Sequence, residues 1–294
     1  NQVKYSLMCN PNGGIIDDLV FANIDKDDYH YMVINAGRIT EDLAHINTQL
    51  SSFQSKGKDV RYDFIDTDAL IAFQGKTAVD VMSKLVPDFD FNELKFFYLT
   101  HMQVQGIHVQ VSRTGYTGED GFEIAVSNER VQEFVELLLN QEGVKLAGLG
   151  ARDSLRLEAG LCLYGNDIDE TTTPVEADLL WTMSKKRKES GEFVGSQVIR
   201  DQIANGVKRK RVGLIGEKGL TPRGHMKILD EDDNEIGEVT SGSFSPCLQL
   251  PIAMGYVPPE QSELDTGLKV EIRKNKAVDV KVCSLPFVPK GYFK

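Results

Sequence analysis

The last third of the sequence, from about residue 208, contains six short strand-like segments and no convincing helix. The segments are residues 211–215, 226–229, 236–241, 252–257, 268–272 and 278–282. Turn residues such as Asp232-Asp233-Asn234 and Asp265-Thr266-Gly267 separate them. Short strands at close, even spacing are typical of small barrels and jelly rolls. We therefore expect residues 208–294 to form a β-barrel or jelly-roll domain.

Before residue 208, predicted strands and helices alternate. Apolar positions fall on one helical stripe from residue 40 to Gly57 and again over residues 77–85, whereas residues 15–21, 29–35, 69–74 and 107–111 have the composition of strands. A further helix follows residue 127, and Ser127 is its predicted N-cap. The fold class expected for residues 1–207 is α+β.

Composition excludes several classes of protein. No apolar run in the 294 residues is long enough to cross a bilayer, and a net charge of -11 argues against general nucleic-acid binding. The four cysteines are scattered without paired spacing and the five histidines are dispersed, so we expect no disulfide framework and no metal. Two basic runs, 185–188 and 208–211, are either solvated faces or contacts for an acidic partner or anionic tail.

The central stretch 148–176 is dense in charge. Its first part reads as a short helix that begins at a glycine turn, has Asp153 in its first turn, and ends at Gly160. Charged residues lie among leucines here. Because charges beside apolar surface are costly unless they are paired, this arrangement favours a functional site over a purely stabilising role. A structural ion pair between Asp153 and Arg156 is the competing interpretation. A dinucleotide fingerprint at Gly148 is disfavoured because the third glycine is absent.

Two acids occur side by side in the predicted strand of residues 15–21. Alternate strand residues share a face, so Asp17 and Asp18 point in opposite directions and one of them lies among apolar neighbours. A carboxylate in such surroundings holds a proton more readily, which suits acid–base work. A solubilising pair at a strand end is the alternative.

A third acid, Glu123, follows the turn signal Asp120-Gly121. Phe122, Ile124 and Val126 share one strand face, which leaves Glu123 on the other face with Ala125. If that face lines a cleft, Glu123 is a fixed acceptor for a pair of donors on a ligand ring. Exposure to solvent is the equally open alternative.

These residues give the chain a resemblance to the aminomethyltransferases, the T subunits of the glycine cleavage system, in their mitochondrial form. The similarity runs along almost the whole chain and is carried by blocks at 13–19, 35–37, 113–123, 148–176, 240–242 and 252–257. The resemblance implies two α+β domains and a C-terminal barrel around a folate cleft. It also implies that roughly the first quarter of a complete subunit is missing, which agrees with a chain that opens on Asn1 inside a strand-like segment.

The implied reaction takes an aminomethyl group from the lipoyl arm of the H subunit, releases ammonia, and passes the carbon to tetrahydrofolate as methylene-tetrahydrofolate. By the resemblance, Asp18 is the catalytic carboxylate and Glu123 holds the pterin ring. Arg152 and Tyr292 match further substrate-binding positions, and Trp181 forms part of the pocket wall. We expect the three groups Asp18, Glu123 and Arg152 to converge on one pteridine.

The implied partners are tetrahydrofolate and the lipoylated H subunit, and the implied location is the mitochondrial matrix. Two related functions compete. A folate-binding iron-sulfur assembly factor would carry a cysteine where this chain has Glu192-Phe193-Val194-Gly195-Ser196. A sarcosine- or dimethylglycine-type demethylating enzyme would add a flavin domain, and none is visible here.

Overall fold

The computed structural model describes residues 1–24, 29–274 and 276–293 and divides into two compact units. The first unit comprises Asn1–Tyr5, Leu19–Gly148 and Gly291–Lys294, and the second comprises Ser6–Asp18 and Leu149–Lys290. The bounds 1–207 and 208–294 that we expect for the domains stay a prediction. In the described part of the chain, every helix is too short or too polar to span a membrane.

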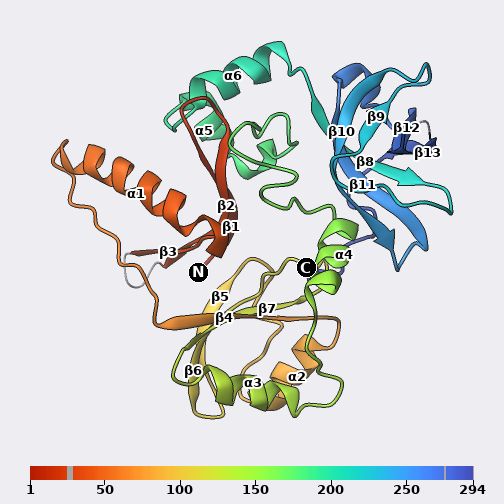
Figure 1. The fold of residues 1–294 in the computed structure, drawn as a ribbon. Helices are drawn as coiled ribbons and strands as arrows, with labels where there is room; N and C mark the ends of the chain where they lie inside the picture. Colours follow the sequence, from red (N-terminus) through yellow and green to blue (C-terminus); the bar gives the residue numbers. More distant parts are fainter. Residues whose placement is uncertain (25–28, 275, 294) are drawn as a thin grey trace. The chain divides into compact units, whose positions relative to one another are not determined.

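The first unit is built on a four-stranded antiparallel sheet (Figure 1). Its strand order is β4 (Asp68–Gln74), β7 (Gly121–Ser127), β6 (Ile107–Ser112) and β5 (Leu99–Val104). Helices α2 (Ala78–Leu85) and α3 (Val131–Leu139) cover one face of the sheet. The largest core cluster lies there and includes Phe122, Ile124 and Val126, so the predicted alternation along β7 is confirmed.

The opposite face of this sheet is more polar. Strands β1 (Val3–Cys9), β2 (Ile15–Ile24) and β3 (Tyr29–Val33) form a second sheet, and a small cluster around Val3, Ala22 and Leu99 joins its first-unit residues to the face that carries Glu123. The predicted strands over residues 15–21 and 29–35 are therefore confirmed.

The helix predicted after residue 40 is α1 (Ile39–Gln54), preceded by the 3₁₀ turn η1 (Ala36–Arg38). Its one fully buried residue is Asp42, whereas Phe53 on the predicted apolar stripe is half exposed, at 50%. The 3.6-residue pattern thus correctly predicted a helix. The apolar stripe of that helix, however, is not fully buried among the described residues.

The second unit contains the predicted barrel, which is closed and has six strands. The strand order around it is β10 (Glu235–Ser245), β11 (Leu250–Val257), β8 (Lys210–Gly216), β13 (Lys276–Cys283), β12 (Gly267–Arg273) and β9 (Lys227–Leu229). Valines dominate its core, as expected for β-branched residues on a pleated surface. The short turn η3 (Pro259–Gln261) follows β11.

Helix α4 (Leu149–Glu158) packs on the barrel wall, where Leu157 meets Ile252 and Met254 of β11. The helix ends as predicted, because Gly160 adopts φ +67, a conformation that glycine tolerates best. The remaining elements of this unit are η2 (Leu180–Thr182), α5 (Lys185–Ser190) and α6 (Ser196–Asn205).

The predicted cap at Ser127 is wrong. Helix α3 has Arg130 at its N-cap without a capping side chain, and the Ser127 hydroxyl instead accepts from the Glu129 amide at 3.3 Å. The reason is local: Arg130 N donates to Ser127 O at 2.9 Å, so residues 127–130 close a turn before the helix begins.

Candidate functional site

The five predicted site residues are divided between the two units. Glu123 on β7 and Tyr292 lie in the first unit, whereas Asp18, Arg152 and Trp181 lie in the second. Their convergence on one ligand therefore stays a prediction, and each residue is described in its own surroundings.

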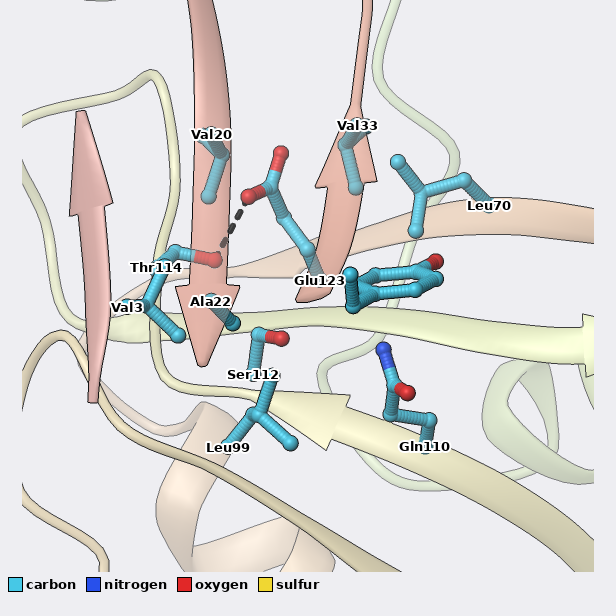
Figure 2. Close-up of a pocket in the computed structure, with 11 residues that line it drawn as sticks. Val3, Val20, Ala22, Val33, Leu70, Leu99, Gln110, Ser112, Thr114 and Glu123 are labelled. Atoms are coloured by element: carbon cyan, nitrogen blue, oxygen red, sulfur yellow. Dashed lines mark hydrogen bonds between the residues drawn. The ribbon is translucent and has the colours of Figure 1, made fainter. Parts of the chain in front are cut away.

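Glu123 lines a pocket inside the first unit. Register pairs place it between Ala72 of β4 and Ser112 of β6, on the sheet face opposite the two helices. The pocket is partly open to solvent and is lined by Val3, Val20, Ala22, Tyr31, Val33, Leu70, Leu99, Gln110, Ser112, Thr114 and Glu123. Figure 2 shows the carboxylate rising from β7 toward Val20 of β2 and Val33 of β3.

The half-buried carboxylate of Glu123 has two different oxygens. Oε2 accepts a hydrogen bond of 2.5 Å from the Thr114 hydroxyl, drawn as the dashed line in Figure 2. Oε1 accepts no hydrogen bond from the residues that the structure describes. One fixed oxygen and one available oxygen beside apolar walls form an acceptor for a donor group on a flat ligand.

Tyr31 is a second polar group in this pocket that sequence reasoning missed. Burial raises the pKa of its phenol, and the negative charges of Asp68 and Glu123 raise it further, while a hydrogen bond with the Gln110 side chain acts in the opposite direction. The phenol thus stays protonated and is available as a donor. Its only sequence signal was its position in the predicted strand over residues 29–35.

Tyr292 lies in the C-terminal segment that belongs to the first unit. Its ring stacks on Phe96 with centroids 4.0 Å apart and planes 13° from parallel, and burial raises its pKa to about 12. The next ring, Phe293, lies 3.9 Å from the Arg113 guanidinium, and Gly291 N donates to Gly118 O at 2.8 Å. These contacts fix the segment against the loop that precedes Glu123.

Asp18 lies on β2 in the second unit and is half-buried, while Asp17 is fully buried, so the acid that alternation places among apolar neighbours is Asp17. The start of this strand is tightly held. Ile15 O accepts from the Tyr164 hydroxyl at 3.0 Å, and a side chain at Gly14 would meet Glu170 O at 1.8 Å, so only glycine fits there. The central stretch therefore fixes the strand that carries Asp18.

The charges of the central stretch form a buried network around Arg156. Its guanidinium donates to Asp167 at 2.7 Å, to Asp153 at 2.8 Å and to the Ser241 hydroxyl at 2.9 Å. Asp167 also accepts from Leu163 N and from the Thr240 and Ser241 hydroxyls. The Asp153–Arg156 ion pair, which was the alternative interpretation of this stretch, is thus present. Arg156 also links α4 to β10 of the barrel.

Arg152, one turn of α4 away, is exposed, and so is Trp181 on η2, at 64%. Cys162, in the same central stretch, is buried. Its burial, opposed by the charge of Arg211 and assisted by the charges of Asp167 and Asp18, raises the pKa of its thiol to about 12. None of the four cysteines, all of them among the described residues, forms a disulfide bond. The residues that the structure describes contain no group of three or more His, Cys, Asp or Glu placed to hold a metal ion.

The two basic runs differ in structure. Residues 185–188 lie on α5 and are mostly exposed. In the other run, Arg211 is buried and donates to Ala177 O at 2.8 Å, and Arg209 pairs with Glu176 at 3.2 Å. The interpretation of that second run as a solvated face is wrong for Arg211, because carbonyls of the second unit use its donors.

Comparison with known proteins identifies the class to which this fold belongs. Residues 1–187 match the GCVT N-terminal domain, and residues 209–289 match the glycine cleavage T-protein C-terminal barrel domain. A crystal structure of glycine cleavage system aminomethyltransferase T from Bartonella henselae superposes with a TM-score of 0.87 at 37% identity, covering 100% of this chain and 78% of that one.

Two mitochondrial aminomethyltransferases show the same relationship in sequence. The protein from Solanum tuberosum is 46% identical over 291 residues, covering 98% of this chain and 71% of the relative, and the human protein is 46% identical over 294 residues, covering 100% and 72%. The chain belongs to the glycine cleavage T-protein family. Its activity is that of a tetrahydrofolate-dependent aminomethyltransferase of the glycine cleavage system.

Proposed function

We propose that the pocket around Glu123 holds the pterin ring of tetrahydrofolate, the acceptor that the family uses. The observation that carries this proposal is the Glu123 carboxylate, which keeps one oxygen free of hydrogen bonds from the described residues within largely apolar walls. A pterin has apolar faces and an edge of paired N–H donors, so the residues present fit such a group. The uncommitted oxygen of Glu123 would accept from that edge.

Asp18 is the proposed catalytic carboxylate. Tetrahydrofolate supplies the nitrogen that receives the one-carbon unit as ammonia leaves the lipoyl-bound aminomethyl group, and the product is methylene-tetrahydrofolate. Positive charge develops at the carbon, and the attacking nitrogen must lose a proton. A half-buried carboxylate stabilises that charge and accepts that proton. The held start of β2 supports the role, because it limits the positions that Asp18 can take.

Three further residues complete the proposed substrate contacts. Arg152 offers an exposed cation to an anionic part of the ligand, and Tyr292 and Trp181 offer aromatic surface. Tyr292 is supported by its stacking on Phe96 in the unit that contains Glu123. Arg152 and Trp181 rest on the family resemblance and on their exposure.

The proposed partner is the lipoylated H subunit, which carries the aminomethyl group. The exposed basic residues of α5 are the better candidate to contact an acidic surface of this partner. In the 208–211 run, by contrast, two arginines already form hydrogen bonds or ion pairs with residues of the second unit. The relatives are named as mitochondrial proteins, and the matrix is the proposed location.

The role of Asp18 can be separated from folate binding by the variant Asp18→Asn. We expect its dissociation constant for tetrahydrofolate to stay within about twofold, because the shape is kept, and its single-turnover formation of methylene-tetrahydrofolate from loaded H subunit to fall by about 100-fold or more. Asp201→Asn on α6, exposed in the same unit, is the control and should keep the full rate. Equal transfer rates in Asp18→Asn and the unsubstituted chain would remove Asp18 from the mechanism.

A further inference from the structure

We propose that Thr114 is a positioning residue for Glu123, and that its hydroxyl sets the plane in which the Glu123 carboxylate faces the pterin. This inference rests on the proposed function of the Glu123 pocket. Thr114 is 3% exposed and lies in the connection between β6 and β7, nine residues before Glu123. A buried threonine has a single hydroxyl hydrogen, and here the hydrogen goes to Glu123 Oε2.

The bond to Glu123 is short and charge-assisted. A hydroxyl that donates to a carboxylate at 2.5 Å contributes more than a neutral hydrogen bond, and the β-branched threonine side chain has few rotamers in which to break it. Without this bond, the Glu123 carboxylate could turn about its terminal torsion, which is broad and roughly two-fold. The bond therefore fixes the plane of the carboxylate and the direction in which Oε1, which accepts no hydrogen bond from the described residues, points.

Thr114 is itself held from β4. The Gln74 amide nitrogen donates to Thr114 O at 3.0 Å and to Phe122 O at 2.9 Å, so one side chain ties together the residues on both sides of the loop. The amide oxygen of Gln74 accepts from the Thr117 hydroxyl at 3.0 Å. A Cβ at Gly115 would lie 1.9 Å from that oxygen, so a larger residue there would displace the Gln74 amide from these hydrogen bonds.

A second anchor holds the far end of the same loop. The Arg113 guanidinium makes two parallel hydrogen bonds to Asp120, at 2.9 and 2.6 Å, and donates to Phe91 O and Leu94 O at 2.7 Å each. Since Arg113 is 1% exposed and every one of these bonds is short, residues 113–120 have little freedom. The loop therefore presents Thr114 to Glu123 as a rigid donor.

The test is the variant Thr114→Val, which removes the donor and retains most of the volume. We expect the KM for tetrahydrofolate to rise about tenfold with kcat within about twofold, because the ligand is bound less well while Asp18 is untouched. Thr114→Ser restores the hydroxyl and should return KM to within about threefold of the unsubstituted chain. Thr100→Val, on the helix-covered face of β5, is the matched control and should leave KM unchanged.

A double-mutant cycle shows whether Thr114 acts through Glu123. In a Glu123→Ala background, Thr114→Val should change KM by less than about twofold, because the group it positions is gone. If Thr114→Val fails to fold, as urea unfolding would reveal, Thr114→Ala supplies the same loss of the hydroxyl.

The outcomes separate this inference from the function on which it rests. Glu123→Gln with an unaltered dissociation constant for tetrahydrofolate would remove the pocket assignment itself. Two other outcomes would overturn the positioning role alone. In the first, Glu123→Gln binds tetrahydrofolate more weakly but Thr114→Val leaves KM unchanged. In the second, Thr114→Val raises KM as much in the Glu123→Ala background as in the unsubstituted chain.

Discussion

Arg156 joins α4 to β10 within the second unit, and the sequence predicts it either in a site or in a simple ion pair. The structure places it at 2% exposure between Asp167 and Ser241, with Asp153 at the more solvated side. A buried cation is tolerated only beside its partners. Removing one partner therefore lowers the stability of the fold strongly, even though the intact ion pair adds little net stability. Asp167 and Asp153 contact the same guanidinium from environments of very different burial.

That difference yields a prediction at the residue scale. Asp167→Asn should lower the free energy of unfolding by about 3–5 kcal/mol, because it leaves the Arg156 charge buried beside a neutral group. Asp153→Asn is the matched control. Its side chain is 50% exposed, and the change should stay within about 1 kcal/mol. Urea unfolding of the two variants measures both, and equal shifts in their midpoints would show that the network is not what holds α4 to the barrel.

At the scale of elements, α5 is the shortest α-helix in the described part of the chain, and four of its six residues are basic. It begins at Ser184, whose hydroxyl accepts from the Arg187 amide at 3.2 Å, and ends at Gly191 in the left-handed conformation. Its lysines are almost unengaged within the chain, because the Lys185–Glu189 pair at 3.8 Å joins two highly exposed side chains. Such a helix can present positive charge to a partner without losing internal bonds.

The corresponding prediction concerns charge reversal on α5. Lys185→Glu with Lys186→Glu should weaken binding of the lipoylated H subunit by about tenfold at low salt, and the loss should shrink as salt screens the charges. Lys218→Glu with Lys276→Glu, two exposed lysines of the barrel unit, is the control with the same change in net charge. Calorimetric titration at two salt concentrations measures the affinities. Equal losses in both double variants would point to overall charge rather than to α5.

The helices and strands show which structural features the sequence patterns predict and which they do not. Alternation correctly predicted the faces of β7 and that one of Asp17 and Asp18 is buried, because a strand has a period of two whatever it packs against, but it did not show that the buried acid is Asp17. The helical stripe predicted α1 but not its burial, which depends on neighbouring elements that the pattern does not contain. The cap at Ser127 failed for a similar reason, since a serine serves a turn and a helix start equally well.

At the scale of the whole molecule, the six-stranded barrel was predictable and the contacts that build the pocket were not. Strand lengths and turns are local properties of the sequence. The hydrogen bond from Thr114 to Glu123, by contrast, depends on the conformation of the eight-residue connection between β6 and β7, which Gln74 of β4 holds in place. Arg211 gives the same lesson, because a basic run reads alike in sequence whether its side chains face solvent or carbonyl groups. Family resemblance supplied the roles of Asp18, Glu123, Arg152, Tyr292 and Trp181, and those roles stay predictions.

The central claim is that the Glu123 pocket of the first unit binds the pterin of tetrahydrofolate. Calorimetric titration of tetrahydrofolate into the chain, into Glu123→Gln and into Glu129→Gln tests it most directly, since Glu129 is an exposed glutamate six residues further along. We expect Glu123→Gln to raise the dissociation constant by about tenfold or more, because hydrogen bonds to a charged acceptor are lost, and Glu129→Gln to leave it unchanged. Equal affinity in all three proteins would contradict the account.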